Sequence, residues 1–182
     1  LCYEAMKDVE LVETEITTPL TKMKTGKLDE DNYAFIPILR AGLGMVDGVI
    51  NVVPNARIGH IGMYRNEETF EPVNYFFKVP GGIENREVFL LDPMLATGGS
   101  AIDAVGSLKA KGVKKIKFLC IIAAPEGIKA LNKAHPDVEI YCANIDEKLN
   151  ENKIKGVIGN FTCPYRIDYT FCLKTTGRHR RL

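Results

Sequence analysis

The 182-residue sequence lacks the patterns of several protein classes. No apolar run is long enough to cross a bilayer, so we expect no membrane partner. The five cysteines form no Cys-x-x-Cys pair and the three histidines lie far apart, so a zinc site is not expected. Neither the Walker loop nor the Gly-x-Gly-x-x-Gly dinucleotide pattern is present. Scattered cysteines are typical of a reducing compartment, and we expect a cytoplasmic protein.

Strand and helix patterns alternate after about residue 33. In the segment 100–111, Ala101, Ala104, Val105 and Leu108 repeat at helical spacing and Gly112 ends the pattern. Alternation of this kind predicts an α/β fold, a parallel sheet flanked by helices. The predicted strands are 33–39, 56–63, 87–91, 116–123 and 138–143, and the predicted helices are 43–53, 100–111 and 126–133.

One region departs from this alternation. A polar connection, 66–72, joins two extended runs, 58–64 and 73–79. The pattern predicts a β-hairpin arm at about 58–80, standing off the sheet, although a plain surface excursion would also fit.

The segment from Val88 to Ala101 carries the strongest chemical signal. An apolar run ends in Asp92, a Thr-Gly-Gly-Ser turn follows at 97–100, and a helix begins at once. The N–H groups of such a turn and of the first helical turn converge where the helix dipole is positive, which favours an anion. A strand-to-helix turn with convenient glycines is the plainer interpretation. The order of residues favours a sugar phosphate, with its phosphate in the turn and its ribose hydroxyls on Asp92.

A second turn of this type follows the predicted strand 33–39. Arg40 comes directly after the strand, and the small residues 41–44 lead into a helix. The planar guanidinium group of arginine binds phosphate oxygens in pairs, so Arg40 is a candidate pyrophosphate ligand.

Four segments together resemble the uracil phosphoribosyltransferases, from about Leu1 to Asn152. They are Ile36–Met45, Gly59–Arg65, Asp92–Ser100 and Ile122–Gly127. In most phosphoribosyltransferases two acids precede the loop, and the Asp-Pro variant found here is similar to that of the uracil enzymes. A purine phosphoribosyltransferase fits this variant less well. The family has a helical segment before the position of Leu1, so we expect an N-terminal truncation.

The resemblance implies a type I phosphoribosyltransferase fold and the reaction of uracil with phosphoribosyl diphosphate (PRPP) to give UMP and pyrophosphate. It also implies Mg2+ carried mainly by PRPP, a homo-oligomer, and an arm that covers the active site. No direct metal ligand and no catalytic residue is assigned. The implied PRPP contacts are Arg40, Arg65, Asp92, Pro93, Met94, Leu95, Ala96, Thr97, Gly98, Gly99 and Ser100.

The C-terminal part, 153–182, departs from the family. A Gly-Asp-Ala-Gly-Asp loop that contacts uracil is absent, so no uracil-binding residue is identified. The segment has seven basic residues and one acid, which leaves a charge of −5 on residues 1–152 and +6 on the tail. Codons for Gly177 to Arg181, displaced by one base, can encode Gly-Asp-Thr-Gly-Asp. We therefore interpret the phosphoribosyltransferase domain as residues 1–152 and the tail as frameshifted or intron-derived, not as a nucleic-acid-binding arm.

Two hypotheses from different classes follow. The first is a uracil phosphoribosyltransferase of pyrimidine salvage. The second is a non-catalytic homologue that binds PRPP or a nucleotide and lacks a uracil site. The loop that follows Asn152 discriminates between them.

Overall fold

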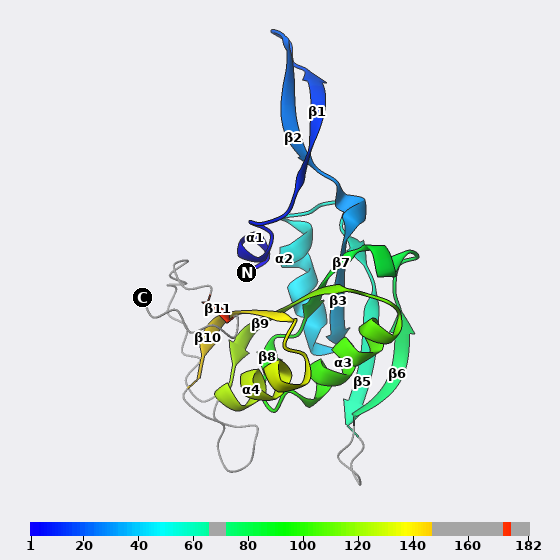
Figure 1. Cartoon of the computed structure of the whole chain (residues 1–182), viewed down its shortest axis with the longest axis vertical. Coiled ribbons are helices and arrows are strands. Elements are labelled where there is room, and N and C mark those ends of the chain that lie inside the picture. The colour runs from blue at the N-terminus through cyan, green and yellow to red at the C-terminus, as the bar shows by residue number, and fades with distance from the viewer. Residues whose placement is uncertain (66–71, 147–172, 176–182) are drawn as a thin grey trace.

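The computed structural model describes residues 1–65, 72–146 and 173–175. Its main sheet has the strand order β11-β10-β9-β7-β3-β5-β6, with β4 beside β3 and β8 beside β9 (Figure 1). Neighbours from β10 across to β5 are parallel, whereas β6 and β11 are antiparallel to their partners. The strands are β3 (Tyr33–Leu39), β4 (Arg57–Ile58), β5 (His60–Arg65), β6 (Pro72–Lys78), β7 (Glu87–Leu91), β8 (Met94–Leu95), β9 (Lys115–Ala123), β10 (Glu139–Ile145) and β11 (Leu173–Thr175).

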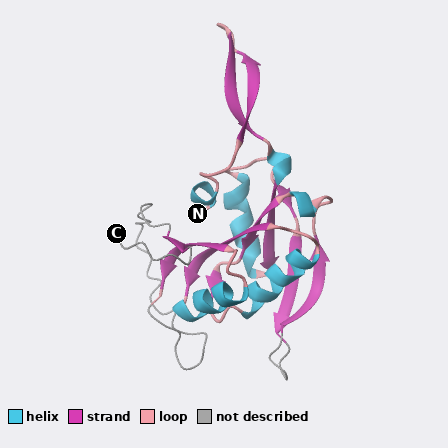
Figure 2. Ribbon diagram, in the orientation of Figure 1, coloured by secondary structure: helices cyan, strands magenta, loops and turns pink. Residues whose placement is uncertain are grey.

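Helices lie on both faces of this sheet, as predicted (Figure 2). Val88 and Leu90 of β7 pack with α3 and α4, whereas Phe89 and Leu91, which alternate with them, pack with α1 and α2. None of the helices in the described part is long and apolar enough to cross a bilayer. The helices are α1 (Cys2–Ala5), α2 (Val46–Ile50), α3 (Gly99–Ala110) and α4 (Pro125–Ala134), with short 3-10 helices η1 (Glu30–Asn32), η2 (Ala41–Met45) and η3 (Ile83–Asn85).

A buried lysine attaches α1 to the sheet. Lys117 of β9 donates a hydrogen bond of 2.9 Å to the carbonyl oxygen of Ala5 and forms an ion pair of 2.8 Å with Glu87. Its ammonium group also lies 5.4 Å from the centre of the Phe89 ring. Burial of a lysine costs free energy unless its charge has partners, and Glu87 is such a partner for Lys117. The same ammonium group also donates to a carbonyl at the end of α1, where the last carbonyls have no partner within the helix.

Two predicted elements differ from the observed ones. The strand predicted over 56–63 is interrupted at Gly59, whose N–H donates to the carbonyl of Phe35 at 3.1 Å. The helix predicted over 43–53 is a 3-10 turn followed by the five-residue α2. Glycine and β-branched residues are frequent in this segment, and both kinds of residue disfavour a long α-helix.

The predicted hairpin at 58–80 is confirmed, but its relation to the sheet is not as predicted. β5 and β6 pair antiparallel, with a bulge between Gly62 and Met63. β5 also pairs with the end of β3, through Ile61 and Gly62, so the base of the hairpin extends the main sheet and does not stand off it. The tip, 66–71, lies outside the described residues.

A different hairpin projects from the body, and the sequence analysis did not predict it (Figure 1). It consists of β1 (Leu11–Thr17) and β2 (Lys22–Leu28), which pair along their whole length. One face carries Glu13 and Glu15 beside Lys24 and Lys22, with the Glu13–Lys24 pair at 2.7 Å. Val12 and Ile16 alternate with Glu13 and Glu15 in the sequence, but most of the hairpin is exposed, and Leu28 at its base packs against the core.

Candidate active site

Backbone hydrogen bonds fix the loop that follows β7. The N–H of Asp92 donates to the carbonyl of Leu119 at 3.1 Å, and the carbonyl of Pro93 accepts from both Ile121 and Ile122 at 3.0 Å. Two residues further on, the carbonyl of Leu95 accepts from Ala124 at 2.8 Å. The loop is therefore attached to β9 at each step and presents Asp92 at the carboxyl end of the strands, where α/β sheets bind ligands.

The Asp92 carboxyl is half-buried. Burial raises its pKa to about 6, although a hydrogen bond from the backbone N–H of Met94 opposes this rise. Near neutral pH the group is mostly ionised, and it can accept hydrogen bonds from hydroxyl groups. A half-buried carboxylate with a raised pKa is a frequent feature of functional sites.

The turn after Leu95 has the geometry that an anion site requires. Gly98 adopts a left-handed conformation, with φ of 88°, and caps α3, which begins at Gly99. The first N–H groups of an α-helix have no partner within the helix and point out of its end. The first turn of α3 contains no acidic residue that would repel an anion. Thr97, Gly98, Gly99 and Ser100 thus lie at a helix N-terminus of positive potential.

Arg40 lies at the same edge of the sheet as Asp92. β3 and β7 are parallel neighbours, and Arg40 follows Leu39 as Asp92 follows Leu91. The Leu39–Arg40 peptide bond is cis. Arg40 is exposed and begins the turn η2, where its carbonyl accepts from Leu43 at 3.2 Å. The two predicted anion turns are therefore adjacent.

Arg65, the other predicted arginine, ends β5 and pairs through its backbone with Pro72. Its side chain lies outside the described part. β5 is the neighbour of β3, so the hairpin that carries Arg65 lies beside the strand that leads into the Arg40 turn.

Two glycines that the sequence analysis did not single out allow neighbouring segments to pack closely against these turns. A Cβ atom on Gly127, in the first turn of α4, would lie 2.5 Å from the carbonyl oxygen of Ala96. A Cβ atom on Gly42 would lie 2.5 Å from the carbonyl oxygen of Leu91. Neither approach could be predicted from sequence, because the closeness of two segments distant along the chain is a tertiary property.

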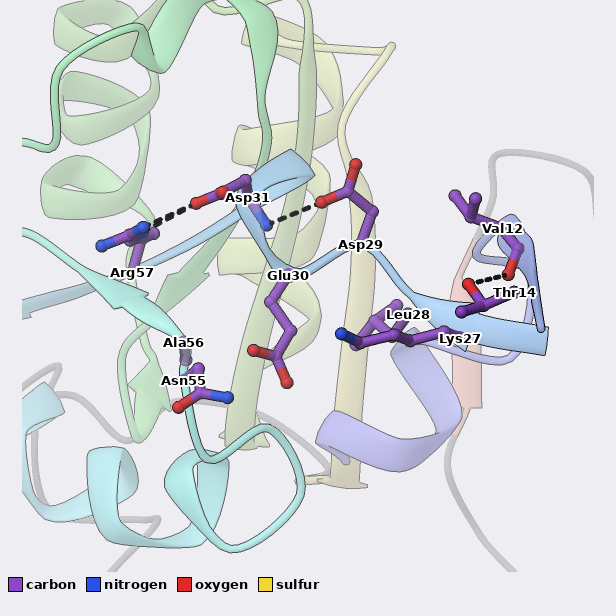
Figure 3. Close-up of a pocket in the computed structure, with 10 residues that line it drawn as sticks. All are labelled: Val12, Thr14, Lys27, Leu28, Asp29, Glu30, Asp31, Asn55, Ala56 and Arg57. Atoms are coloured by element: carbon purple, nitrogen blue, oxygen red, sulfur yellow. Dashed lines mark hydrogen bonds and ion pairs between the residues drawn. The ribbon is translucent and has the colours of Figure 1, made fainter. Parts of the chain in front are cut away.

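A cavity of about 630 Å³ lies elsewhere, at the base of the β1–β2 hairpin (Figure 3). Its lining includes Asp29, Glu30 and Asp31, which precede β3 and therefore lie at the opposite end of that strand from Arg40. Arg57 binds Asp31 at 2.7 Å and holds the pKa of that carboxyl below its usual value. The charge of Asp31 is therefore already paired, and we assign the chemistry to the end of the sheet that carries Asp92.

The fold is that of the phosphoribosyltransferases. It resembles the purine phosphoribosyltransferase from Pyrococcus horikoshii, with a TM-score of 0.51 and 20% identity, over 64% of this chain and 72% of that one. The AQ2163 protein from Aquifex aeolicus is more similar, with a TM-score of 0.78 and 42% identity, over 83% of this chain and 72% of that one.

Within this class the chain belongs to the uracil phosphoribosyltransferase family, whose model matches residues 1–161. The uracil phosphoribosyltransferase of Wolinella succinogenes is 62% identical over 152 residues, which cover 84% of this chain and 73% of that protein. That of Streptococcus salivarius is 59% identical over 150 residues, 82% of this chain and 72% of that protein. The predicted resemblance is confirmed.

Proposed function

We propose that this chain transfers the phosphoribosyl group of PRPP to uracil, giving UMP and pyrophosphate in pyrimidine salvage. Membership of the family supports the reaction. The observation that carries the proposal is the adjacency of two turns, one after Asp92 and one at Arg40, that follow neighbouring parallel strands and have the sequence pattern of anion sites. PRPP has phosphate groups at both ends of a ribose, so it requires two anion sites with a hydroxyl acceptor between them.

In the proposed complex, the turn 97–100 binds the 5-phosphate through backbone N–H groups at the start of α3. Asp92 accepts hydrogen bonds from the ribose hydroxyls. The backbone of Pro93, Met94, Leu95 and Ala96 connects these two parts and is attached to β9. Arg40 and Arg65 bind the pyrophosphate end, where a guanidinium group can engage two oxygens at once.

The reaction requires no nucleophile from the protein. A nitrogen of uracil attacks the anomeric carbon and loses its proton, while the bond to pyrophosphate breaks and its electron pair leaves with the pyrophosphate. The transition state has oxocarbenium character, so orientation of the two substrates and stabilisation of the departing negative charge provide the acceleration.

Mg2+ would neutralise charge on the pyrophosphate. In the part of the chain that the structure describes, no group of three His, Cys, Asp or Glu side chains could hold a metal ion. Asp92 is followed by Pro93 and not by a second acid. This donor set fits a Mg2+ ion held mainly by substrate oxygens and water, since Mg2+ usually retains several waters.

Three further features belong to this proposal. The protein would act in the cytoplasm, as a homo-oligomer, and without a nucleic-acid partner. The charge of −5 on residues 1–152 supports the last of these, because a nucleic-acid surface is normally basic.

Formation of UMP from uracil and PRPP, with hypoxanthine as the competing base, tests the proposal. Because the Gly-Asp-Ala-Gly-Asp loop is absent, we expect PRPP to bind and product to form only slowly, from uracil and not from hypoxanthine, and only with Mg2+ present. Product from hypoxanthine, or no binding of PRPP in calorimetry, would contradict it.

A non-catalytic PRPP-binding homologue is the alternative. The absence of a Gly-Asp-Ala-Gly-Asp loop after Asn152 favours it, because residues 153–182 then supply no recognised uracil contact. The tail, apart from 173–175, lies outside the described residues. Tight binding of PRPP without any formation of UMP would support this alternative.

A further inference from the structure

Two glycines lie against the proposed PRPP site with no room for a side chain. At Gly127 a Cβ atom would lie 2.5 Å from the carbonyl oxygen of Ala96 and 2.8 Å from that of Leu95. At Gly42 it would lie 2.5 Å from the carbonyl oxygen of Leu91 and 3.1 Å from the Cα atom of Pro37. All these obstructing atoms are backbone atoms, which cannot turn aside as a flexible side chain does.

Backbone conformation does not explain either glycine. Among the described residues, the glycines with positive φ are Gly82, Gly98 and Gly112. Gly127 lies in the first turn of α4 and Gly42 in η2, where any residue can adopt the backbone angles. Alanine is preferred to glycine inside a helix, so the local preference is against glycine at Gly127. The close approach of another segment is what requires glycine at these two positions.

Gly127 acts on the phosphate half of the site. The N–H of Ala124, just before α4, is bonded to the carbonyl of Leu95. A Cβ atom on Gly98 would in turn lie 3.1 Å from the carbonyl oxygen of Gly127 and 3.3 Å from the Cβ atom of Ala130. α4 thus packs directly on the phosphate turn, and added bulk at Gly127 would push the backbone of 95–98 away from it.

Gly42 acts on the pyrophosphate half. It lies two residues after Arg40, and its Cα is held against the carbonyl of Leu91, the residue before Asp92. A side chain at this position would separate the Arg40 turn from the Asp92 loop. Contacts of 3.4 Å or more are ordinary, so relief of a 2.5 Å contact requires a movement of roughly 0.9 Å at either glycine.

We propose that Gly127 and Gly42 are positioning residues, each of which sets one half of the PRPP site: Gly127 the phosphate turn and Gly42 the Arg40 turn. This inference rests on the proposed function. Neither glycine contacts the substrate itself in this arrangement; each acts by allowing a neighbouring backbone to approach.

Four single substitutions test the inference on the full chain. Gly127→Ala and Gly42→Ala fill the two close contacts. Gly106→Ala in α3 and Gly48→Ala in α2 are the matched controls, since a Cβ atom at either position meets nothing within 4 Å. The probes are ribose 5-phosphate for one half of the site and magnesium pyrophosphate for the other, with binding measured by calorimetry.

We expect Gly127→Ala to weaken ribose 5-phosphate by about ten- to a hundredfold and to change pyrophosphate by less than about threefold, because misplacement of a binding group by 1 Å has effects of this size. Gly42→Ala should do the reverse, and both controls should bind like the unsubstituted chain. Equal loss of both probes in each variant, or no loss in either, would overturn the inference.

Two further measurements separate the possible failures. PRPP binding by the unsubstituted chain and by both controls reports on the proposed function alone. Hydrogen exchange at the amides of 96–102 should become faster in Gly127→Ala than in Gly106→Ala even without ligand, and equal rates would sink the assignment to Gly127. If Gly127→Ala is not recovered folded, Ala130→Val can replace it, because Ala130 faces Gly98 from the same side of α4. This variant should also weaken ribose 5-phosphate more than pyrophosphate.

Discussion

The two ends of the parallel strands carry charged residues in opposite circumstances. At the amino end, Asp31 forms ion pairs with Arg57 at 2.7 Å and with Arg86 at 3.9 Å. At the carboxyl end, the described residues contain no ion pair to Asp92, although this carboxyl is the more buried of the two. Paired charges here connect segments of the fold, whereas the half-buried carboxyl of Asp92, to which the described residues offer no cation, is available to a ligand.

The largest effect is expected from the loop that is absent after Asn152. Replacement of the tail 153–182 by one that contains Gly-Asp-Ala-Gly-Asp should raise the rate of UMP formation by orders of magnitude. A site that hydrogen-bonds a base discriminates through those bonds and loses much of its activity without them. Equal and robust activity in the two chains would show that uracil recognition does not need this loop.

The next effect contrasts the two aspartates. Asp92→Ala should weaken PRPP by about 1.5–3 kcal/mol for each ribose hydrogen bond lost to a charged acceptor. Asp31→Ala, at the other end of β3, should leave PRPP affinity unchanged. Calorimetry with PRPP measures both, and an unchanged affinity in Asp92→Ala would contradict the ribose assignment.

A smaller effect contrasts the arginines. Arg40→Lys and Arg65→Lys should each weaken pyrophosphate by about 1 kcal/mol or more, because an ammonium group cannot reproduce the two-point contact of a guanidinium. Arg57→Lys is the control, since Arg57 is bonded to Asp31 and lies away from the site. Retention of full pyrophosphate affinity by both Arg40→Lys and Arg65→Lys would exclude the proposed contacts.

An effect of similar size concerns stability and has opposite signs at the two ends. Burial raises the pKa of Asp92 to about 6 in the folded protein. Folding therefore favours the protonated form, and this contribution is fully present below pH 4 and lost as the pH rises through 6. Asp92→Asn should consequently be more stable than the unsubstituted chain at pH 7–8, by on the order of 1–2 kcal/mol, and the difference should vanish near pH 4.

Asp31→Asn provides the opposite case. The hydrogen bond from Arg57 lowers the pKa of Asp31 in the folded protein, so its contribution to stability is present above the unfolded pKa and lost as the pH falls through the folded one. Urea unfolding should show this variant destabilised at pH 8, and the difference should shrink only as the pH is lowered below about 4. Stabilisation of Asp31→Asn at pH 8 would show that the two ends do not differ in this way.

The main sheet was predictable because most of its elements carry a periodic apolar pattern. The predicted strand 33–39 and the predicted helix 100–111 match β3 and α3 closely, since their apolar residues face a core on one side or on both. The β1–β2 hairpin was not predicted, although Val12 and Ile16 alternate with Glu13 and Glu15, because its exposed strands carry few apolar residues beside many charged ones. A two-stranded hairpin without a packed face has only marginal stability of its own.

The candidate site likewise has one part that is local in sequence and another that depends on the tertiary fold. Asp92 and the turn 97–100 could be predicted because an anion loop is local: strand, acid, glycines and helix follow one another in sequence. The adjacency of Arg40 to Asp92 depends on the pairing of β3 with β7, and the role of Gly127 depends on the packing of α4 on residues 95–98. Arrangements of this kind are set by the tertiary fold, and the functional roles of all these residues remain predictions.

The strand order β9-β7-β3-β5 also has a consequence for how the protein folds. Every pairing in this part of the sheet joins segments separated by a helix or a long connection, so the contacts are non-local and costly in chain entropy to form. No single strand-turn-helix unit holds both turns, since one follows β3 and the other follows β7. The site should therefore appear late on the folding pathway, together with the completed sheet. A ligand that bridges the two turns can then bind only the finished structure, and by mass action it would raise the free energy of unfolding.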